Sequence, residues 1–216
     1  MRSQIHAFLS QPLLMDPTFA IRLAAYADDK SPDMKGLFIN APCPKLAAEA
    51  AATTAKATGQ GKKLTAVIPI YGLIDQPYIR ERFEGGLGRA LVTGPSGVSP
   101  LRCRGARPLG EAILFSTFPE VGTPEEGAAF RRVAQRAKLV RYGTDCYAYA
   151  LVAAGMIDLV IEAGLQAYDV QAPIAVIEAA GGIMTDWQGR PCHDGGRVLA
   201  AANAEIHAEA LALLNG

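Results

Sequence analysis

The sequence lacks a net charge, because its 216 residues include 21 basic and 21 acidic side chains. This balance gives no electrostatic footprint for nucleic acid. It also lacks an apolar run of about 18 residues, so no transmembrane helix is expected. The short apolar stretch at the N-terminus is interrupted by Gln4, His6, Gln11 and Asp16, which argues against a signal peptide. We therefore expect a cytoplasmic protein without nucleic-acid or membrane partners.

Cysteine and histidine are scarce. The cysteines are Cys43, Cys103, Cys146 and Cys192. None forms a CxxC pair, which argues against a zinc site of familiar spacing, and reduced thiols are expected. With three histidines and no GxSxG motif, Ser-His-Asp chemistry is not indicated. The segment GPSG at 94–97 is typical of a turn, and GGLGRALVTG is typical of a hairpin. His207 is expected at the surface of the last helix.

What the sequence has is a globular composition, with 50% hydrophobic and 19% charged residues. From residue 72 onward, strand-like and helix-like runs alternate with short connections, which predicts an α/β fold with helices packed on a sheet. Strands are expected within 111–120, 138–143, 156–164, 182–189 and 196–202. Helices are expected at 123–137, 144–155, 169–182 and 203–216, with Thr123 and Asn203 as N-caps and Gly155 as a stop.

The first third of the chain has a weaker pattern. PTFAIRLAAYADD predicts one short helix, and the alanine-rich stretch at 45–63 is either a weak helix or a linker. LTAVIPIYGLID at 64–75 is the first strong strand signal, and Pro69 within it favours an edge strand or a bulge. We therefore expect an irregular helical arm over 1–71 ahead of the α/β part.

Acidic residues lie where the expected strands end. Asp145, Glu162 and Asp169 each occupy such a position, and Arg141 is near them in sequence. Carboxylate oxygens at strand ends are what Mg²⁺ prefers, and Arg141 suits a phosphate or carboxylate. Capping alone also explains Asp145 and Asp169, since both fit helix N-caps. Glu162 lies in an apolar strand and must be at its end or paired.

At this point a family resemblance becomes visible. The segment RYGTDCYAYALVAAGMIDLVIEAGLQAYDVQAPIAVIEAAGGIMTDWQG resembles the C-terminal half of the inositol monophosphatase family. Within that family it is most similar to the histidinol-phosphate phosphatase branch, because of GTDCYAYALVAAG and the Tyr168-Asp169 pair, although most members carry Trp before this Asp. The resemblance extends upstream through GLIDQPYIRERFEGG and covers about 72–216.

The resemblance implies layered α and β elements and Mg²⁺-dependent hydrolysis of a phosphate monoester, in which metals activate water and neutralise the phosphate. By position, Asp169 matches a late metal-binding Asp of the family. Glu162 matches an acidic residue that contacts the polyol or amine of the substrate, and Arg141 and Asp145 fall where the substrate pocket is shaped. A phosphorylated small molecule is the implied partner, and self-association is possible.

The sequence also departs from the family. The family has an earlier Glu-Glu pair and a DPxDGT loop, which supply most of the metal ligands. The acidic residues before residue 72 are Asp16, Asp28, Asp29, Asp33 and Glu49, and none lies in such a motif. Because Mg²⁺ gives up its water reluctantly, one ligand holds it poorly. We therefore expect this chain alone to be a poor phosphatase or none.

Residues 8–74 carry a second, shorter resemblance, to phage-type S49 peptidases of the capsid-assembly kind, through FLSQPLLMDPTFAIRLAAYADD and KKLTAVIPIYGLI. The serine and lysine of that family have no counterpart here. The two resemblances meet within YGLIDQ, which suggests a chimera. Three interpretations follow: a phosphatase with an incomplete site, a non-catalytic chimera or scaffold, and a fragment of a peptidase.

Overall fold

The computed structural model describes residues 71–216. The helix expected at 17–29, the alanine-rich stretch and the peptidase-like arm, apart from its last residues, lie outside the described residues. They stay predictions, as does a chimera.

The first layer is a four-stranded antiparallel sheet whose strands follow chain order. Its strands are β1 (Tyr71–Gln76), β2 (Glu81–Gly86), β3 (Arg89–Gly94) and β4 (Gly97–Pro100). Leu87 and Gly88 form the β2–β3 turn with positive φ angles of 51° and 74°, which suit a two-residue hairpin. The hairpin expected in GGLGRALVTG and the turn expected at GPSG are both confirmed.

The second sheet has five strands in the order β6-β5-β7-β9-β8. Its members are β5 (Ile113–Ser116), β6 (Leu139–Tyr142), β7 (Leu159–Gln166), β8 (Ile183–Thr185) and β9 (Gly195–Ala201). β5 pairs in parallel with both β6 and β7, so these three strands present their carboxyl ends at one edge. β9 is antiparallel to β7 and β8. A short 3₁₀ helix, η2 (Leu109–Glu111), precedes β5.

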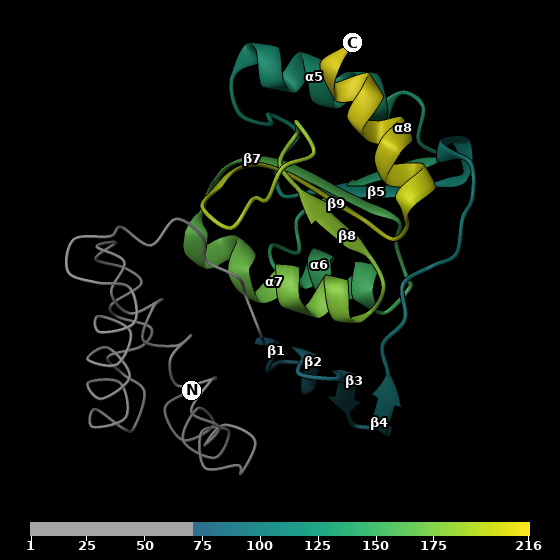
Figure 1. Cartoon of the computed structure of the whole chain (residues 1–216), viewed down its shortest axis with the longest axis vertical. Coiled ribbons are helices and arrows are strands. Elements are labelled where there is room, and N and C mark those ends of the chain that lie inside the picture. Colours follow the sequence, from purple (N-terminus) through teal and green to yellow (C-terminus); the bar gives the residue numbers. More distant parts are fainter. Residues whose placement is uncertain (1–70) are drawn as a thin grey trace, which may run out of the picture. The chain divides into compact units, whose positions relative to one another are not determined.

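Helices cover both faces of the five-stranded sheet (Figure 1). One face carries α5 (Pro124–Ala134) and α8 (Ala204–Asn215), and the other carries α6 (Tyr147–Ala153) and α7 (Ala167–Ala179). α6 and α7 lie between the two sheets. Thr123 and Asn203 cap α5 and α8, and Gly155 follows α6 with φ 69°, as the sequence predicts. The α/β fold is confirmed.

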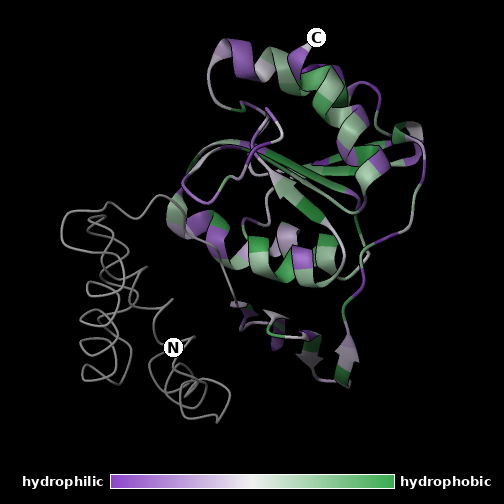
Figure 2. Ribbon diagram, in the orientation of Figure 1, coloured by the Kyte–Doolittle hydropathy of each residue, from purple (hydrophilic) through white to green (hydrophobic). Residues whose placement is uncertain are grey.

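Two apolar clusters hold the layers together, one on each face of the five-stranded sheet. Along β7, Val160 belongs to the cluster with α6 and α7, and its neighbours Leu159 and Ile161 belong to the cluster with α5 and α8. This alternation follows from the two-residue period of a strand. The buried parts of the central strands are accordingly hydrophobic on both faces, and Figure 2 shows green along much of this sheet.

α7 packs on the four-stranded sheet through two glycines. A Cβ atom at Gly72 would lie 2.1 Å from the carbonyl oxygen of Ala172, and one at Gly85 would lie 2.3 Å from the Cα atom of Val176. Neither distance is possible for a real side chain. The backbone of α7 therefore approaches the sheet closely because these two positions carry no side chain.

Candidate functional site

Glu162 is the centre of the candidate site. It lies in β7, it is 5% exposed, and both of its carboxylate oxygens are engaged. Oε1 accepts from the backbone N–H of Thr117 at 3.0 Å and from the Thr117 hydroxyl, and Oε2 accepts from the Tyr149 hydroxyl at 2.5 Å. Of the two alternatives expected for Glu162, pairing is confirmed, and the strand-end position is wrong because β7 continues to Gln166. A carboxylate has about four acceptor positions, so one remains for a ligand.

Asp169 lies seven residues further on, in the first turn of α7. Its Oδ2 accepts from the backbone N–H of Gln166 at 2.8 Å. The interpretation of Asp169 as the N-cap is wrong, because α7 begins at Ala167 and Gln166 is the N-cap residue. Asp169 instead supplies the carboxylate half of a capping box at the third helical position. The capping bond uses Oδ2 of Asp169 and does not involve Oδ1.

Asp145 belongs to an unusual turn before α6. Gly143, Thr144 and Asp145 have φ angles of 92°, 73° and 44°. The expected cap role of Asp145 is wrong, because α6 begins at Tyr147 after Cys146, and Asp145 contributes its backbone carbonyl to the N–H of Ala148. Left-handed backbone at a β-branched residue such as Thr144 is strained and is typical of ligand-binding turns.

Electrostatics connects these acidic residues. Partial burial raises the pKa of the Cys146 thiol, and the charges of Asp145, Asp169 and Glu162 raise it further. Burial also raises the pKa of Tyr149 well above its ordinary value, and Glu162, Cys192 and Asp169 add to this effect. The three predicted carboxylates thus all lie near enough to Cys146 to act on its thiol.

Arg141 does not join them. It lies on the edge strand β6, it is exposed, and its guanidinium donates to the carbonyl of Val140 at 3.0 Å. A role in substrate binding stays a prediction.

Sequence reasoning missed Thr117 and Tyr149, the two partners of Glu162. Thr117 directly follows β5, so it shares the carboxyl edge of the sheet with the end of β7. The position of Thr117 after an expected strand could have identified it from the sequence as a candidate partner of Glu162. Tyr149 comes from a helix 13 residues earlier, and the apolar sequence of α6 gives no sign that a hydroxyl among its buried residues faces a carboxylate.

A second buried carboxylate, Asp158, was also missed and lies before β7. Its side chain is 0% exposed and accepts from Arg104 at 2.9 Å and from the backbone N–H of Ile113 at 2.9 Å. Arg107 adds an ion pair at 3.3 Å without hydrogen-bond alignment. Because Asp158 directly precedes β7, its ion pairs and hydrogen bonds hold Arg104, Arg107 and the start of β5 at the beginning of that strand.

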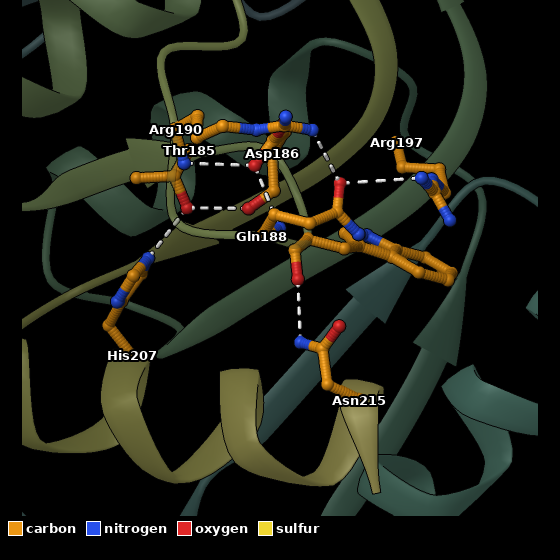
Figure 3. Close-up of polar contacts among 8 residues, drawn as sticks. Thr185, Asp186, Gln188, Arg190, Arg197, His207 and Asn215 are labelled. Carbon is orange, nitrogen blue, oxygen red and sulfur yellow. Dashed lines mark hydrogen bonds and ion pairs between the residues drawn. The ribbon is translucent and has the colours of Figure 1, made fainter.

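His207 is half-buried, which corrects the expectation of a surface position. Its Nε2 lies 2.8 Å from the Thr185 hydroxyl, and burial lowers its pKa. Figure 3 shows this pair beside a network in which Asp186 binds Arg190 and Asn215 donates to the Trp187 carbonyl. These contacts join α8 to the β8–β9 connection, so the cluster is structural.

The donor set of residues 71–216 was tested against the requirements of a magnesium ion. Within this range no group of three or more His, Cys, Asp or Glu side chains is arranged to hold a metal. Three hydrogen bonds use all but one of the acceptor positions of Glu162, and one oxygen of Asp169 accepts the capping bond. The described residues therefore do not form a magnesium site by themselves.

Comparison with known proteins decides the family. Residues 65–215 match the inositol monophosphatase family, which is more than half of the chain. The chain belongs to the inositol monophosphatase family. The match begins slightly upstream of residue 72, where the sequence analysis places the boundary.

Relatives in the family include two kinds of phosphatase. The chain is 41% identical over 152 residues to the chloroplastic bifunctional phosphatase of Arabidopsis thaliana, covering 66% of this chain and 43% of that protein. It is 30% identical over 151 residues to the histidinol-phosphatase of Streptomyces coelicolor, covering 68% and 56%. It thus spans about half the length of these curated relatives.

A solved inositol monophosphatase from Zymomonas mobilis superimposes with a TM-score of 0.64 at 33% identity, covering 69% of this chain and 58% of that one. The solved structure therefore agrees with the family assignment. In the part of the chain from residue 71 onward, no helix has the length and apolar character needed to cross a membrane.

Proposed function

We propose that this chain carries the substrate-binding half of a phosphate-monoester phosphatase of the histidinol-phosphate type. The observation that carries the proposal is Glu162, a buried carboxylate that three donors from Thr117 and Tyr149 hold in one position. A carboxylate fixed in this way can accept from the ammonium or hydroxyl group of a substrate without reorganising, because its orientation is set before the ligand arrives.

The charge of the site favours an amino alcohol over a neutral polyol. Asp145, Glu162 and Asp169 act on the same thiol, and the guanidinium of Arg141 is turned to its own strand. Such a site attracts an ammonium or imidazolium group and repels a phosphate unless a cation neutralises it. The family relation to a histidinol-phosphatase supports the same substrate class.

Binding tests this proposal directly. Isothermal titration should show tighter binding of histidinol than of myo-inositol, and Glu162→Gln should weaken histidinol binding about tenfold or more, since a charge-assisted hydrogen bond is lost. Glu205→Gln, which alters an exposed glutamate on α8, is the matched control. Equal binding of both alcohols, or an unchanged affinity in Glu162→Gln, overturns the proposal.

Turnover is expected at background. Phosphate release from histidinol phosphate, measured with and without Mg²⁺, should not exceed the rate without protein, because the described carboxylates do not complete a metal site. Turnover that disappears in Asp169→Ala contradicts this expectation and means that ligands come from residues 1–70 or from a second chain.

The absence of a metal-holding group of carboxylates among residues 71–216 favours a second candidate. This candidate is a non-catalytic scaffold or chimera that keeps the fold without the reaction. Histidinol binding separates the two, because a scaffold has no reason to keep an affinity that depends on Glu162.

A further inference from the structure

α6 is attached to both sheets by the same chemistry. Tyr149 donates to Glu162 of the five-stranded sheet, and Tyr147 donates to Oε2 of Glu81 in the four-stranded sheet at 2.8 Å. Two helical residues that are two apart point in different directions, so the two hydroxyls reach opposite layers. Figure 1 shows α6 between these layers. The Tyr149 bond belongs to the candidate site, whereas the Tyr147 bond lies outside it.

Tyr147 is fixed from β2 in a second way. Its ring packs edge-to-face on Phe83 with 5.8 Å between centroids and an interplanar angle of 71°. Phe83 is 2% exposed, so it is a fixed part of the core. Edge-to-face pairs and hydrogen bonds to a carboxylate are both directional. Together they set where the first residue of α6 lies relative to β2.

The position of Tyr147 in turn determines the strained turn before it. The backbone N–H of Tyr147 binds the carbonyl of Thr144 at 2.9 Å, and Ala148 N–H binds that of Asp145 at 3.1 Å. Thr144 and Asp145 have left-handed φ angles, which persist only where the surroundings hold them. On the other side, Gly143 N–H binds the carbonyl of Ser116 at 3.0 Å. The turn is thus held between the end of β5 and the start of α6.

We infer that Glu81 and Tyr147 are positioning residues that hold the turn at Gly143–Cys146, and through it set how Asp145 faces the ligand bound at Glu162. The first part stands on the geometry of the free protein, and the part that concerns the ligand rests on the proposed function. Glu81 is 66 residues from Tyr147 in sequence, and the bond from the Tyr147 hydroxyl connects it to the start of α6.

The test replaces Glu81 and follows the turn by NMR. In Glu81→Ala, the amide resonances of Thr144, Asp145 and Cys146 should shift, and hydrogen exchange at Tyr147 and Ala148 should accelerate about fivefold, as for one lost hydrogen bond. Tyr147→Phe should reproduce these changes, and the double variant should add little to either. Glu81→Gln keeps an acceptor oxygen and should largely restore the wild-type spectrum.

The matched control is Glu84→Ala, which removes another tyrosine–glutamate bond from the same strand, the 2.8 Å bond from Tyr71. It should leave the turn resonances in place. Unmoved turn resonances in Glu81→Ala, or equal shifts in Glu84→Ala, overturn the positioning role.

Histidinol titration then separates the two claims. Glu81→Ala should weaken histidinol binding about fivefold while myo-inositol binding changes less, because only an ammonium ligand gains from the charge of Asp145. If the wild type binds histidinol and Glu81→Ala binds it equally well, the ligand part of the inference fails. If the wild type does not bind histidinol at all, the proposed function fails, and the amide shifts still decide the positioning role.

Discussion

The Tyr149 hydroxyl donates a 2.5 Å hydrogen bond to Glu162. Both residues are buried, with Tyr149 2% exposed and Glu162 5% exposed. Burial and the neighbouring carboxylates raise the pKa of Tyr149 well above its ordinary value of 10.0, so the hydroxyl stays a donor throughout the neutral range. A buried carboxylate is stable only when donors satisfy it. The hydrogen bond between Tyr149 and Glu162 therefore places this part of the candidate site in the protein core, where it also contributes to stability.

Tyr149→Phe should destabilise the domain by about 1.5–3 kcal/mol, the range for a hydrogen bond to a charged group whose removal leaves that charge less satisfied. Urea unfolding at pH 7 measures this. Tyr168→Phe is the control, because Tyr168 is 49% exposed and should change stability by less than about 0.5 kcal/mol. Equal stability of wild type and Tyr149→Phe means that Glu162 does not depend on this donor.

Asp169 can be tested separately as a cap and as a ligand. Asp169→Ala should lower stability by about 0.5–1 kcal/mol, because α7 loses the acceptor of the Gln166 N–H and a negative charge near its N-terminus. Asp169→Asn keeps an acceptor oxygen and should recover most of this loss. Thermal unfolding without metal measures the cap alone.

The ligand role appears only when Mg²⁺ is added. A rise in melting temperature with Mg²⁺ that wild type shows and Asp169→Asn lacks identifies the carboxylate as a metal ligand. No such difference leaves the cap as the only role of Asp169.

The regular elements from residue 72 onward could be predicted, because their signals are local: Thr123 and Asn203 as caps, Gly155 as a stop, and apolar strands between them. The start of α7 could not. Gly164 resembles a strand end, but its φ of 79° and a bulge between Glu162 and Leu165 let β7 continue to Gln166. The N-cap is therefore Gln166, three residues before the expected Asp169.

The candidate site was predictable in part for the same reason. Glu162 and Asp169 could be selected because a carboxylate beside apolar residues is conspicuous in the sequence. The partners of such carboxylates come from distant segments, as with Arg104 and Asp158, which are 54 residues apart. Side-chain direction over such a distance is set by tertiary packing, and no local pattern reports it.

Asp158→Ala should destabilise the domain by about 3–5 kcal/mol, the cost of leaving buried partners of an ion pair without their counter-charge. Arg104 is only 22% exposed at its side chain, so solvent compensates little. The matched control is Asp75→Ala, which breaks the surface pair with Arg82, whose side chains are 33% and 30% exposed, and should cost less than about 1 kcal/mol. Chemical denaturation of both variants gives the comparison, and similar losses contradict a buried ion pair at Asp158.

His207 should make stability depend on pH in the acid range. Burial lowers its pKa below the ordinary value of 6.5, so the unfolded chain binds the proton more readily. Stability is then complete above about pH 6.5 and is lost as the pH falls through the lower folded value. His207→Gln should flatten the dependence of the melting temperature on pH between pH 7 and pH 5. A wild-type slope in His207→Gln assigns the effect to other groups.

Gly85→Ala should separate α7 from the four-stranded sheet. The added methyl would lie 2.3 Å from the Cα atom of Val176, and backbone on both sides leaves no flexible side chain to move away. We expect a loss of about 3 kcal/mol, at the upper end of the range for overpacking, measured by urea unfolding. Gly105→Ala is the control, since no atom lies within 4 Å of its added methyl. Because α7 also carries Asp169, the strained variant should weaken histidinol binding at a temperature where it is still folded. A fully stable Gly85→Ala contradicts the close approach of helix and sheet.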